Sequence, residues 1–331
     1  MANDFILQQT TFALFSKIKK MKSIIITGAN SGIGFECTMR MATLAPHHQI
    51  ILACRNIQAG NEAVRKIQQK TNHKNLICLP LDLASLQSVR DFKTAFLKLA
   101  SPAISALINN AGIQNISKTA YTKDGFEITF GTNHLGGFYL TLILLANIEK
   151  NGSITFTSSD THDPLAKTAI EPPSFTTGNE LAFPKEVFEK EKTVGQRRYS
   201  TSKLCNVLTA YILHEKLLKK GIRVNAFDPG LTPGTGLAKS YPAPLRFAWK
   251  NIMPMMKYFR KNTNSPETSG RRLANLTFSE ELKELDGIYY SDGKVTKSSV
   301  DSYNKAYQDE LWRSSIELTG ILQEETTIPL I

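Results

Sequence analysis

From Lys22 onward, short apolar runs alternate with longer stretches of helical periodicity. Each run spans six residues, and the stretches between them, such as residues 86–99 and 200–219, are long enough for helices. This alternation is typical of repeated βαβ units, in which a helix connects each strand to the next parallel strand. The predicted strands are residues 23–28, 49–54, 75–80, 105–110, 153–158 and 223–228, with residues 287–292 as a seventh.

The pattern predicts an α/β fold, a Rossmann-type doubly wound parallel sheet of about seven strands in a single domain. We expect residues 1–20 to be an N-terminal extension, with Met21 as an alternative start, and residues 21–331 to form the domain. Residues 161–198 form an insertion, with prolines and threonines followed by an acidic and basic stretch. It is too long for an ordinary connection, and long ordered loops in such folds usually carry function.

The first predicted strand continues directly into a glycine-rich turn. Residues 27–34 read TGANSGIG, and a helical pattern begins at Phe35. Glycines at a strand-to-helix turn let the backbone approach a pyrophosphate, and the helix N-terminus supplies unpaired N–H groups and a partial positive charge. The turn therefore predicts a dinucleotide-binding site.

The end of the second strand indicates which dinucleotide is bound. A carboxylate there would bond the ribose 2′-hydroxyl of NAD and repel the 2′-phosphate of NADP. This chain has Arg55 and no acidic residue in the segment 53–56, and a guanidinium pairs well with a phosphate. We therefore expect NADP(H) as the cofactor, with a solvated arginine as the alternative interpretation.

Together with four further motifs, the G-x-x-x-G-x-G spacing of this turn resembles the short-chain dehydrogenase/reductase family. The other motifs are Asp82 at the end of the third strand, Asn109-Asn110-Ala111-Gly112 at the end of the fourth, Tyr199-Ser200-Thr201-Ser202-Lys203, and Pro229-Gly230 after the sixth. The resemblance covers residues 22–320. It implies an enzyme that transfers hydride to or from a nicotinamide cofactor.

The resemblance also implies residues that bind the cofactor. Asp82 would take the adenine amino group, Asn110 would lie against the adenosine ribose, and Lys203 would bond the nicotinamide ribose. The full expected set is Gly28, Asn30, Ser31, Gly32, Ile33, Gly34, Arg55, Asp82, Leu83, Asn110, Ala111, Gly112, Tyr199, Lys203, Pro229, Gly230 and Thr232. No metal site is expected, because the four cysteines have no CxxC spacing and no histidine cluster beside them.

The expected catalytic residues are Asn133, Ser159, Tyr199 and Lys203. Tyr199 and Lys203 are four residues apart on a predicted helix, so both side chains project from one face. The ammonium and the charge of an oxidised nicotinamide favour the phenolate, which makes Tyr199 the proton donor in carbonyl reduction and the acceptor in alcohol oxidation. By resemblance, Ser159 polarises the substrate carbonyl, with Ser158 as the fallback. Asn133 would hold a water that links Lys203 to solvent.

The C-terminal half favours one branch of the family. Residues 202–209, 269–276 and 287–294 resemble light-dependent protochlorophyllide reductases and, less closely, retinol dehydrogenases, which act on bulky apolar molecules. Leu231 stands where the light-dependent enzyme has a cysteine, and the Ser158-Ser159 pair is more like that of an ordinary carbonyl reductase. We expect hydride transfer to or from a carbonyl or alcohol carbon of a bulky lipophilic substrate. Double-bond reduction of the protochlorophyllide type and a non-catalytic NADP(H)-binding regulator are the alternatives.

The chain is strongly basic, with 40 Lys and Arg against 29 Asp and Glu, a net charge of +11. Residues 239–261 hold six of these cations and no acid, interleaved with aromatic residues and methionines. We interpret residues 235–262 as a substrate lid with a basic outer face that can contact a membrane; a helix packed on the core is the alternative. No motif supports a nucleic-acid partner. Free thiols and no uninterrupted apolar window of ~18 residues favour a cytoplasmic protein, and an oligomer is compatible with the sequence.

Overall fold

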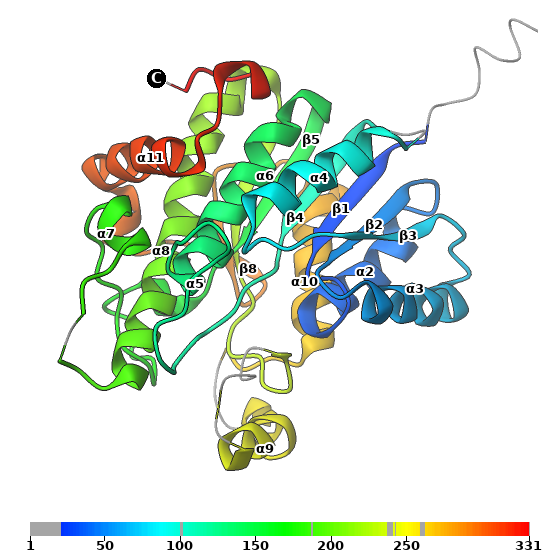
Figure 1. Cartoon of the computed structure of the whole chain (residues 1–331). Helices are drawn as coiled ribbons and strands as arrows, with labels where there is room; N and C mark the ends of the chain where they lie inside the picture. Colours follow the sequence, from blue (N-terminus) through cyan, green and yellow to red (C-terminus); the bar gives the residue numbers. More distant parts are fainter. Residues whose placement is uncertain are drawn as a thin grey trace, which may run out of the picture.

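The computed structural model describes residues 21–99, 102–186, 188–236, 241, 243–258 and 262–330. The N-terminal extension expected at residues 1–20 and parts of the expected lid lie outside this range. Eight strands form one sheet in the order β3-β2-β1-β4-β5-β6-β7-β8 (Figure 1). Their bounds are β1 Ser23–Thr27, β2 Gln49–Cys54, β3 Leu76–Pro80, β4 Ile104–Asn109, β5 Ile148–Thr157, β6 Arg223–Asp228, β7 Tyr289–Ser291 and β8 Lys294–Thr296.

The seven predicted strands are present, and an eighth was not expected. β1 to β7 pair in parallel, whereas β8 pairs antiparallel to β7. The turn between them is Asp292-Gly293, and both residues have positive φ, 49° and 80°. An Asp-Gly pair at positive φ is a strong two-residue hairpin signal, so the sequence did contain the information for this strand.

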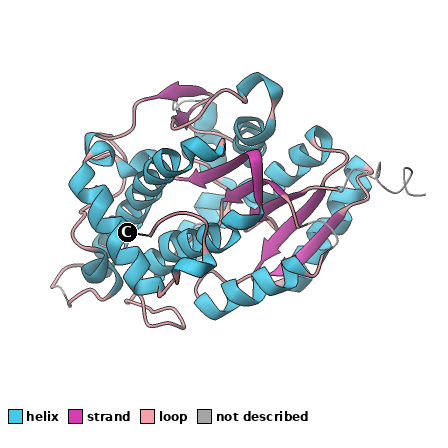
Figure 2. Cartoon of the chain, turned by 90° about the horizontal axis from the view of Figure 1, so that it is seen from above, coloured by secondary structure: helices cyan, strands magenta, loops and turns pink. Residues whose placement is uncertain are grey.

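Helices cover both faces of the sheet, as Figure 2 shows from above. Buried side chains form one apolar cluster on each face: Ile25, Ile51 and Leu107 belong to one, and Ile24 and Ile50 to the other. Strands buried on both faces explain why the runs are continuously apolar. The helices are α2 Gly32–Leu44, α3 Ile57–Thr71, α4 Leu86–Leu97, α5 Ile128–Phe130, α6 Gly136–Leu144, α7 Gly178–Ala182, α8 Glu191–Leu217, α9 Ala243–Asn251, α10 Pro266–Phe278 and α11 Lys305–Thr319.

Local sequence signals explain several helix starts. The side chains of Asn56, Ser85 and Ser265 each accept a hydrogen bond from a backbone N–H of the first turn of α3, α4 and α10. Helix α2 differs, because its N-cap residue Ser31 makes no such side-chain bond. The side chain of Ser31 therefore bonds none of the backbone N–H groups at the start of α2. This N-terminal end of the helix directly follows the glycine turn.

The insertion differs in detail from the sequence-based interpretation. Helix α8 begins at Glu191, so the last part of the insertion expected at residues 161–198 is helix.

Among the described residues, one apolar stretch, Ile128–Asn147, is long and apolar enough to cross a membrane by length and composition. However, 89% of its window is buried inside the protein. Burial in the core accounts for its composition.

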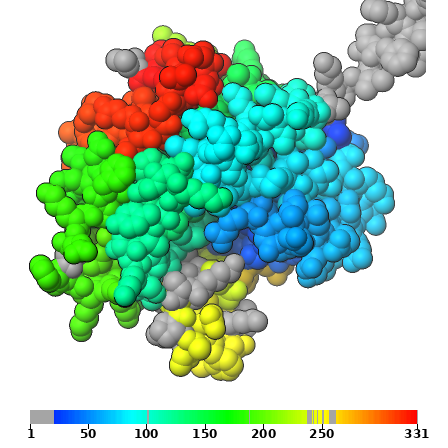
Figure 3. Space-filling view, viewed as in Figure 1, coloured from blue at the N-terminus to red at the C-terminus, as the bar shows by residue number. Residues whose placement is uncertain are grey.

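Helix α9 stands apart from the rest of the molecule. It projects below the carboxyl ends of the strands in Figure 1, and its yellow atoms form a knob in the space-filling view of Figure 3. The indole N–H of Trp249 donates to the carbonyl of Thr235 at 3.1 Å and anchors the helix to the segment that follows β6. The lid expected at residues 235–262 thus contains a short helix that is attached by one face.

Candidate active site

A cavity of about 350 Å³ opens at the carboxyl ends of the central strands. β1 and β4 are neighbours in the sheet although they are not consecutive in the chain, so the strand order reverses between them. Ligands of doubly wound sheets bind outside the carboxyl ends of the strands at such a switch point. Every residue of the predicted cofactor-binding set lines this cavity, and so does Ser159. Of the four predicted catalytic residues, Asn133 is the one that does not line the cavity.

The glycine turn is shaped so that the backbone itself forms the floor of the cavity. Gly28 has φ +66°, a conformation that suits glycine. A Cβ atom on Gly34 would lie 2.5 Å from the carbonyl oxygen of Gly28 and 2.6 Å from Nδ2 of Asn110. No side chain therefore fits at Gly34, which keeps the start of α2 open to a ligand.

Thr27, which the sequence analysis did not single out, ties this turn to the end of β4. Its hydroxyl oxygen accepts hydrogen bonds from the N–H groups of Asn110 and Ala111, both at 2.9 Å. The Asn110 amide in turn donates to the carbonyl of Thr27 at 2.9 Å. Because these partners are more than 80 positions apart in the chain, only the folded sheet reveals the contact.

Asp82 and Arg55 also line the cavity. One Asp82 carboxylate oxygen accepts the N–H of Ala84 at 3.1 Å, which orients the side chain. Arg55 is exposed and directly follows β2. A flexible guanidinium at this rim can pair with a phosphate without prior desolvation.

Tyr199 and Lys203 are buried side by side on helix α8. The Lys203 ammonium lies 5.5 Å from the Tyr199 ring centre and donates to the carbonyl of Thr157 at 3.1 Å. Burial lowers the pKa of Lys203 to about 8, against an opposing effect of Asp228. Burial also raises the pKa of Tyr199, and the carboxylates of Asp160 and Asp228 raise it further. The protein groups therefore favour the protonated phenol, and the positive charge of an oxidised nicotinamide would act in the opposite direction.

The two adjacent serines after β5 have different environments. Ser158 is 1% exposed, and its hydroxyl donates to the main-chain carbonyl of Lys203 at 2.8 Å. The hydroxyl of Ser159 donates to the Asp160 carboxylate at 3.1 Å, and a hydrogen bond with Ser159 lowers the pKa of Tyr199. Ser159 is therefore the serine beside the Tyr199 phenol, while the hydroxyl of Ser158 bonds the end of β5 to α8.

Asn133 lies in a five-residue π-helix, Gly131–Leu135, behind the cavity wall. Its amide oxygen accepts the N–H of Ile113 at 2.7 Å, and its amide nitrogen donates to the Ile113 carbonyl and to the Ser202 hydroxyl, both at 2.9 Å. Ser202 in turn donates to the carbonyl of Tyr199 at 2.7 Å. The Asn133 side chain thus joins the loop after β4 to the helix that carries Tyr199. Single turns of π-helix occur frequently at functional sites.

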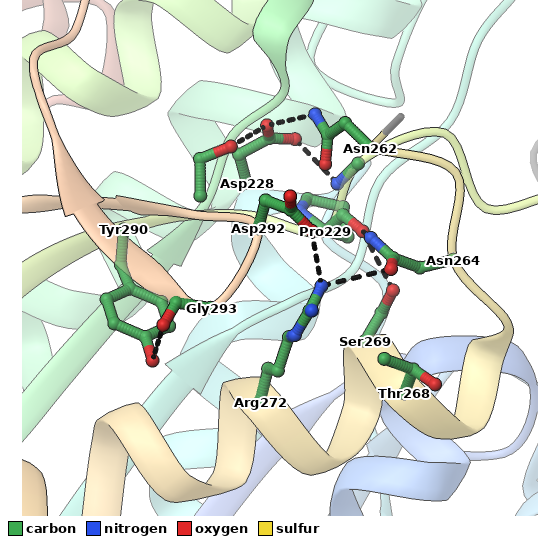
Figure 4. A network of polar contacts seen from close by, with 12 residues as sticks. Asp228, Pro229, Asn262, Asn264, Thr268, Ser269, Arg272, Tyr290, Asp292 and Gly293 are labelled. Carbon is green, nitrogen blue, oxygen red and sulfur yellow. Dashed lines mark hydrogen bonds and ion pairs between the residues drawn. The ribbon is translucent and has the colours of Figure 1, made fainter. Parts of the chain in front are cut away.

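Asp228, a second residue that the sequence analysis missed, organises the loop after β6 (Figure 4). Its carboxylate accepts the N–H of Gly230 at 2.8 Å, the Ser291 hydroxyl at 2.7 Å and the Asn262 amide at 3.2 Å. The carbonyl of Pro229 accepts hydrogen bonds from Asn264 and Ser269. The loop on the predicted nicotinamide side is therefore held from β7, from α10 and from the segment that follows the lid.

Two lid residues close one end of the cavity. Tyr241 and Trp249 line it, and their rings meet edge to face at 6.3 Å between centroids. The Tyr241 hydroxyl donates to the side-chain oxygen of Gln114 at 2.7 Å. This bond joins the lid to the loop after β4 across the cavity.

Comparisons with known proteins point to one family. The model of the short chain dehydrogenase family matches residues 22–168. A polyprenol dehydrogenase of Danio rerio is 33% identical over 308 residues, which cover 91% of this chain and 87% of the relative. Retinol dehydrogenase 12 of Mus musculus is 30% identical over 309 residues, with 92% and 88% coverage. The solved L-sorbose reductase of Gluconobacter frateurii, in complex with NADPH and L-sorbose, shares the fold with a TM-score of 0.58 at 18% identity, covering 84% of this chain and 98% of that one.

Proposed function

Because the chain belongs to the short-chain dehydrogenase/reductase family, we propose that it is an NADP(H)-dependent oxidoreductase that interconverts a carbonyl and an alcohol on a bulky lipophilic substrate. The nicotinamide, when bound, supplies or accepts the hydride. The observation that carries the proposal is that one cavity is lined both by the glycine turn and by the side chains of Ser159, Tyr199 and Lys203. The glycine turn suits a pyrophosphate, and the three side chains suit acid–base chemistry on a carbonyl or alcohol.

The chain's residues fit a dinucleotide. The open backbone at Gly34 and the N–H groups at the start of α2, which the Ser31 side chain does not bond, suit the pyrophosphate. Asp82 would bind the adenine, Asn110 would lie against its ribose, and Lys203 would bond the other ribose. Arg55 would pair with a 2′-phosphate, which is the basis for preferring NADP(H) to NAD(H).

In the proposed reduction, Tyr199 donates its phenolic proton to the substrate oxygen as the carbonyl becomes an alcohol. Ser159 donates a hydrogen bond to the same oxygen and stabilises the negative charge that develops on it. Lys203, whose ammonium lies beside the phenol, stabilises the phenolate that remains. Asn133 holds the loop after β4 against helix α8. It would also hold the water through which Lys203 exchanges protons with solvent.

The substrate class rests on the wall of the cavity and on the relatives. Ile170, Leu231 and Trp249 contribute apolar surface to the cavity. The two relatives named above are a polyprenol dehydrogenase and a retinol dehydrogenase, so each name refers to a long apolar alcohol. We infer a substrate with an extended apolar body and one reactive oxygen.

The lid also supports a proposed place for the protein, in the cytoplasm with peripheral contact to membranes. Phe247, Ile252 and Met255 are exposed by 63%, 57% and 60%, and Arg246 is exposed beside them. The opposite side of α9 contributes Trp249 to the cavity. An apolar and basic outer surface suits an anionic lipid surface, from which a lipophilic substrate could enter under the lid.

A substrate panel tests the proposal. NADPH and NADH oxidation would be followed with aldehydes, ketones, quinones and retinoids, each in the dark and under light. We expect NADPH-dependent turnover of apolar aldehydes or ketones in the dark. Turnover restricted to protochlorophyllide under light would instead establish double-bond reduction, and NADPH binding without turnover of any substrate would indicate a regulator.

A further inference from the structure

His162 lies directly behind the proposed catalytic serine. It ends the short turn Asp160–His162 that follows Ser159, and it is 2% exposed. Its Nδ1 atom is 2.7 Å from the carbonyl oxygen of Ser159, and its Nε2 atom is 3.0 Å from the backbone nitrogen of Ser299. The side chain does not line the cavity. It contacts the main chain of Ser159 and cannot touch a substrate there.

The two contacts determine which ring nitrogen carries the proton. A backbone N–H only donates, so Nε2 must accept from Ser299 and be unprotonated. The proton is then on Nδ1, which donates to the carbonyl of Ser159. Burial lowers the pKa of His162, against the opposing effects of this hydrogen bond and of Asp228, Asp163 and Asp301. The ring therefore stays neutral at physiological pH, with a fixed donor and a fixed acceptor.

The partners of His162 belong to the C-terminal part of the molecule. Ser299 lies 137 positions further along the chain, and its carbonyl accepts the Ser302 hydroxyl at 2.6 Å. The imidazole also packs on Tyr289 of β7, with ring centroids 4.8 Å apart. His162 thus connects the turn after β5 to Tyr289 of β7 and to Ser299, both in the C-terminal part of the chain.

We propose that His162 is a positioning residue, which fixes the main chain of Ser159 so that the serine hydroxyl stays beside Tyr199. This inference rests on the proposed role of Ser159. A hydrogen-bond donor in an active site must be held within about 0.5 Å of its working position. A misplacement of about 1 Å can cost about 100-fold in rate. The other hydrogen bonds of Ser159 are local: its carbonyl also accepts the backbone N–H of His162 at 3.1 Å, and its hydroxyl bonds within the turn, to Asp160 and to the N–H of Thr161. The imidazole connects this turn to Ser299 and Tyr289, and so fixes the Ser159 main chain relative to the rest of the protein.

The test is a double-mutant cycle. His162→Phe keeps a ring against Tyr289 but removes both hydrogen bonds, whereas His162→Asn retains an amide donor near the position of Nδ1. We expect His162→Phe to lower kcat about 10- to 100-fold with the NADPH dissociation constant unchanged. His162→Asn should recover most of the loss. In a Ser159→Ala background, His162→Phe should cost less than about twofold, because the group that it positions is already absent.

Ser299 offers a second test that leaves residue 162 unchanged. Its φ of −60° suits proline, and Ser299→Pro replaces the N–H that holds Nε2 with a ring carbon, which removes the bond and displaces the imidazole from this anchor. Ser299→Ala is the matched control, because the Ser299 hydroxyl has no hydrogen-bond partner among the described residues. We expect a several-fold loss of kcat in the proline variant and none in the alanine variant. This pair also decides the question if His162→Phe fails to fold.

Several results would overturn the inference. An equal loss from His162→Phe with and without Ser159, or a parallel loss of NADPH binding, would mean that His162 acts on the fold in general. Equal activity of the two Ser299 variants would show that the hydrogen bond from Ser299 to His162 has no part in positioning Ser159. If Ser159→Ala alone leaves kcat unchanged, the failure lies with the proposed role of Ser159, and the positioning inference fails with it.

Discussion

The ammonium of Lys203 lies 5.5 Å from the centre of the Tyr199 ring, with both side chains buried on one face of α8. The bond from Lys203 to the Thr157 carbonyl fixes this arrangement against the end of β5. Burial moves the two pKa values in opposite directions, because it disfavours the charged form of each group. The site therefore keeps the Tyr199 phenol protonated beside an amine whose pKa is lowered to about 8.

The carboxylate of Asp160 should set the pH dependence of the reaction. A negative neighbour favours the neutral phenol and raises the pKa of Tyr199. Asp160→Asn removes that charge and should lower the pKa of Tyr199. Alcohol oxidation needs the phenolate, so the rise of kcat/KM for oxidation with pH should occur at lower pH in this variant. The measurement is the pH profile of kcat/KM for oxidation. Asp163→Asn is the control, since the carboxylates that raise the pKa of Tyr199 are those of Asp160 and Asp228. An unmoved profile in Asp160→Asn would refute the effect.

Arg55 should determine the choice between the two dinucleotides. We expect Arg55→Ala to weaken NADPH binding about 10-fold, because it removes one charge-assisted bond to the 2′-phosphate at an exposed site. NADH binding should change little. Fluorescence titration of both cofactors measures the two affinities. Arg65→Ala, at another exposed arginine that does not line the cavity, should leave both unchanged; equal losses for NADPH and NADH in Arg55→Ala would contradict the assignment.

The two neighbouring serines should separate stability from catalysis. Ser158→Ala removes a buried bond to the Lys203 carbonyl and should lower the free energy of unfolding by about 1 kcal/mol, with a small effect on turnover. Ser159→Ala should lower kcat about 100-fold or more with little change in stability. Thermal unfolding and steady-state kinetics of both variants test this. Interchanged results would make Ser158 the serine that contacts substrate.

The outer face of α9 should bind anionic membranes. We expect co-sedimentation with phosphatidylserine vesicles at low salt, weaker binding to phosphatidylcholine vesicles, and a clear loss in Phe247→Ser. Phe188→Ser is the matched control, because Phe188 is fully exposed but lies in the segment between α7 and α8. If both variants bind as the unmodified protein does, the lid is not the membrane contact.

The sequence predicts most of this architecture because its signals are local. Apolar runs, the glycine turn and the four-residue spacing of Tyr199 and Lys203 each depend on residues close together in the chain. Thr27, His162 and Asp228 were missed because their partners are distant: Thr27 bonds to β4, and His162 to Ser299. Their roles follow from the order of strands in the sheet, which no short pattern contains. The β7–β8 hairpin is different, since Asp292-Gly293 is a local signal.

The central claim is that Tyr199 transfers the proton, and Tyr199→Phe tests it most directly. This variant keeps the ring beside Lys203 and removes only the hydroxyl. Single-turnover reduction of an apolar ketone or aldehyde by NADPH should slow by about 100-fold or more, while the NADPH dissociation constant stays within about twofold. An unchanged rate in Tyr199→Phe, with NADPH still bound, would contradict the mechanism.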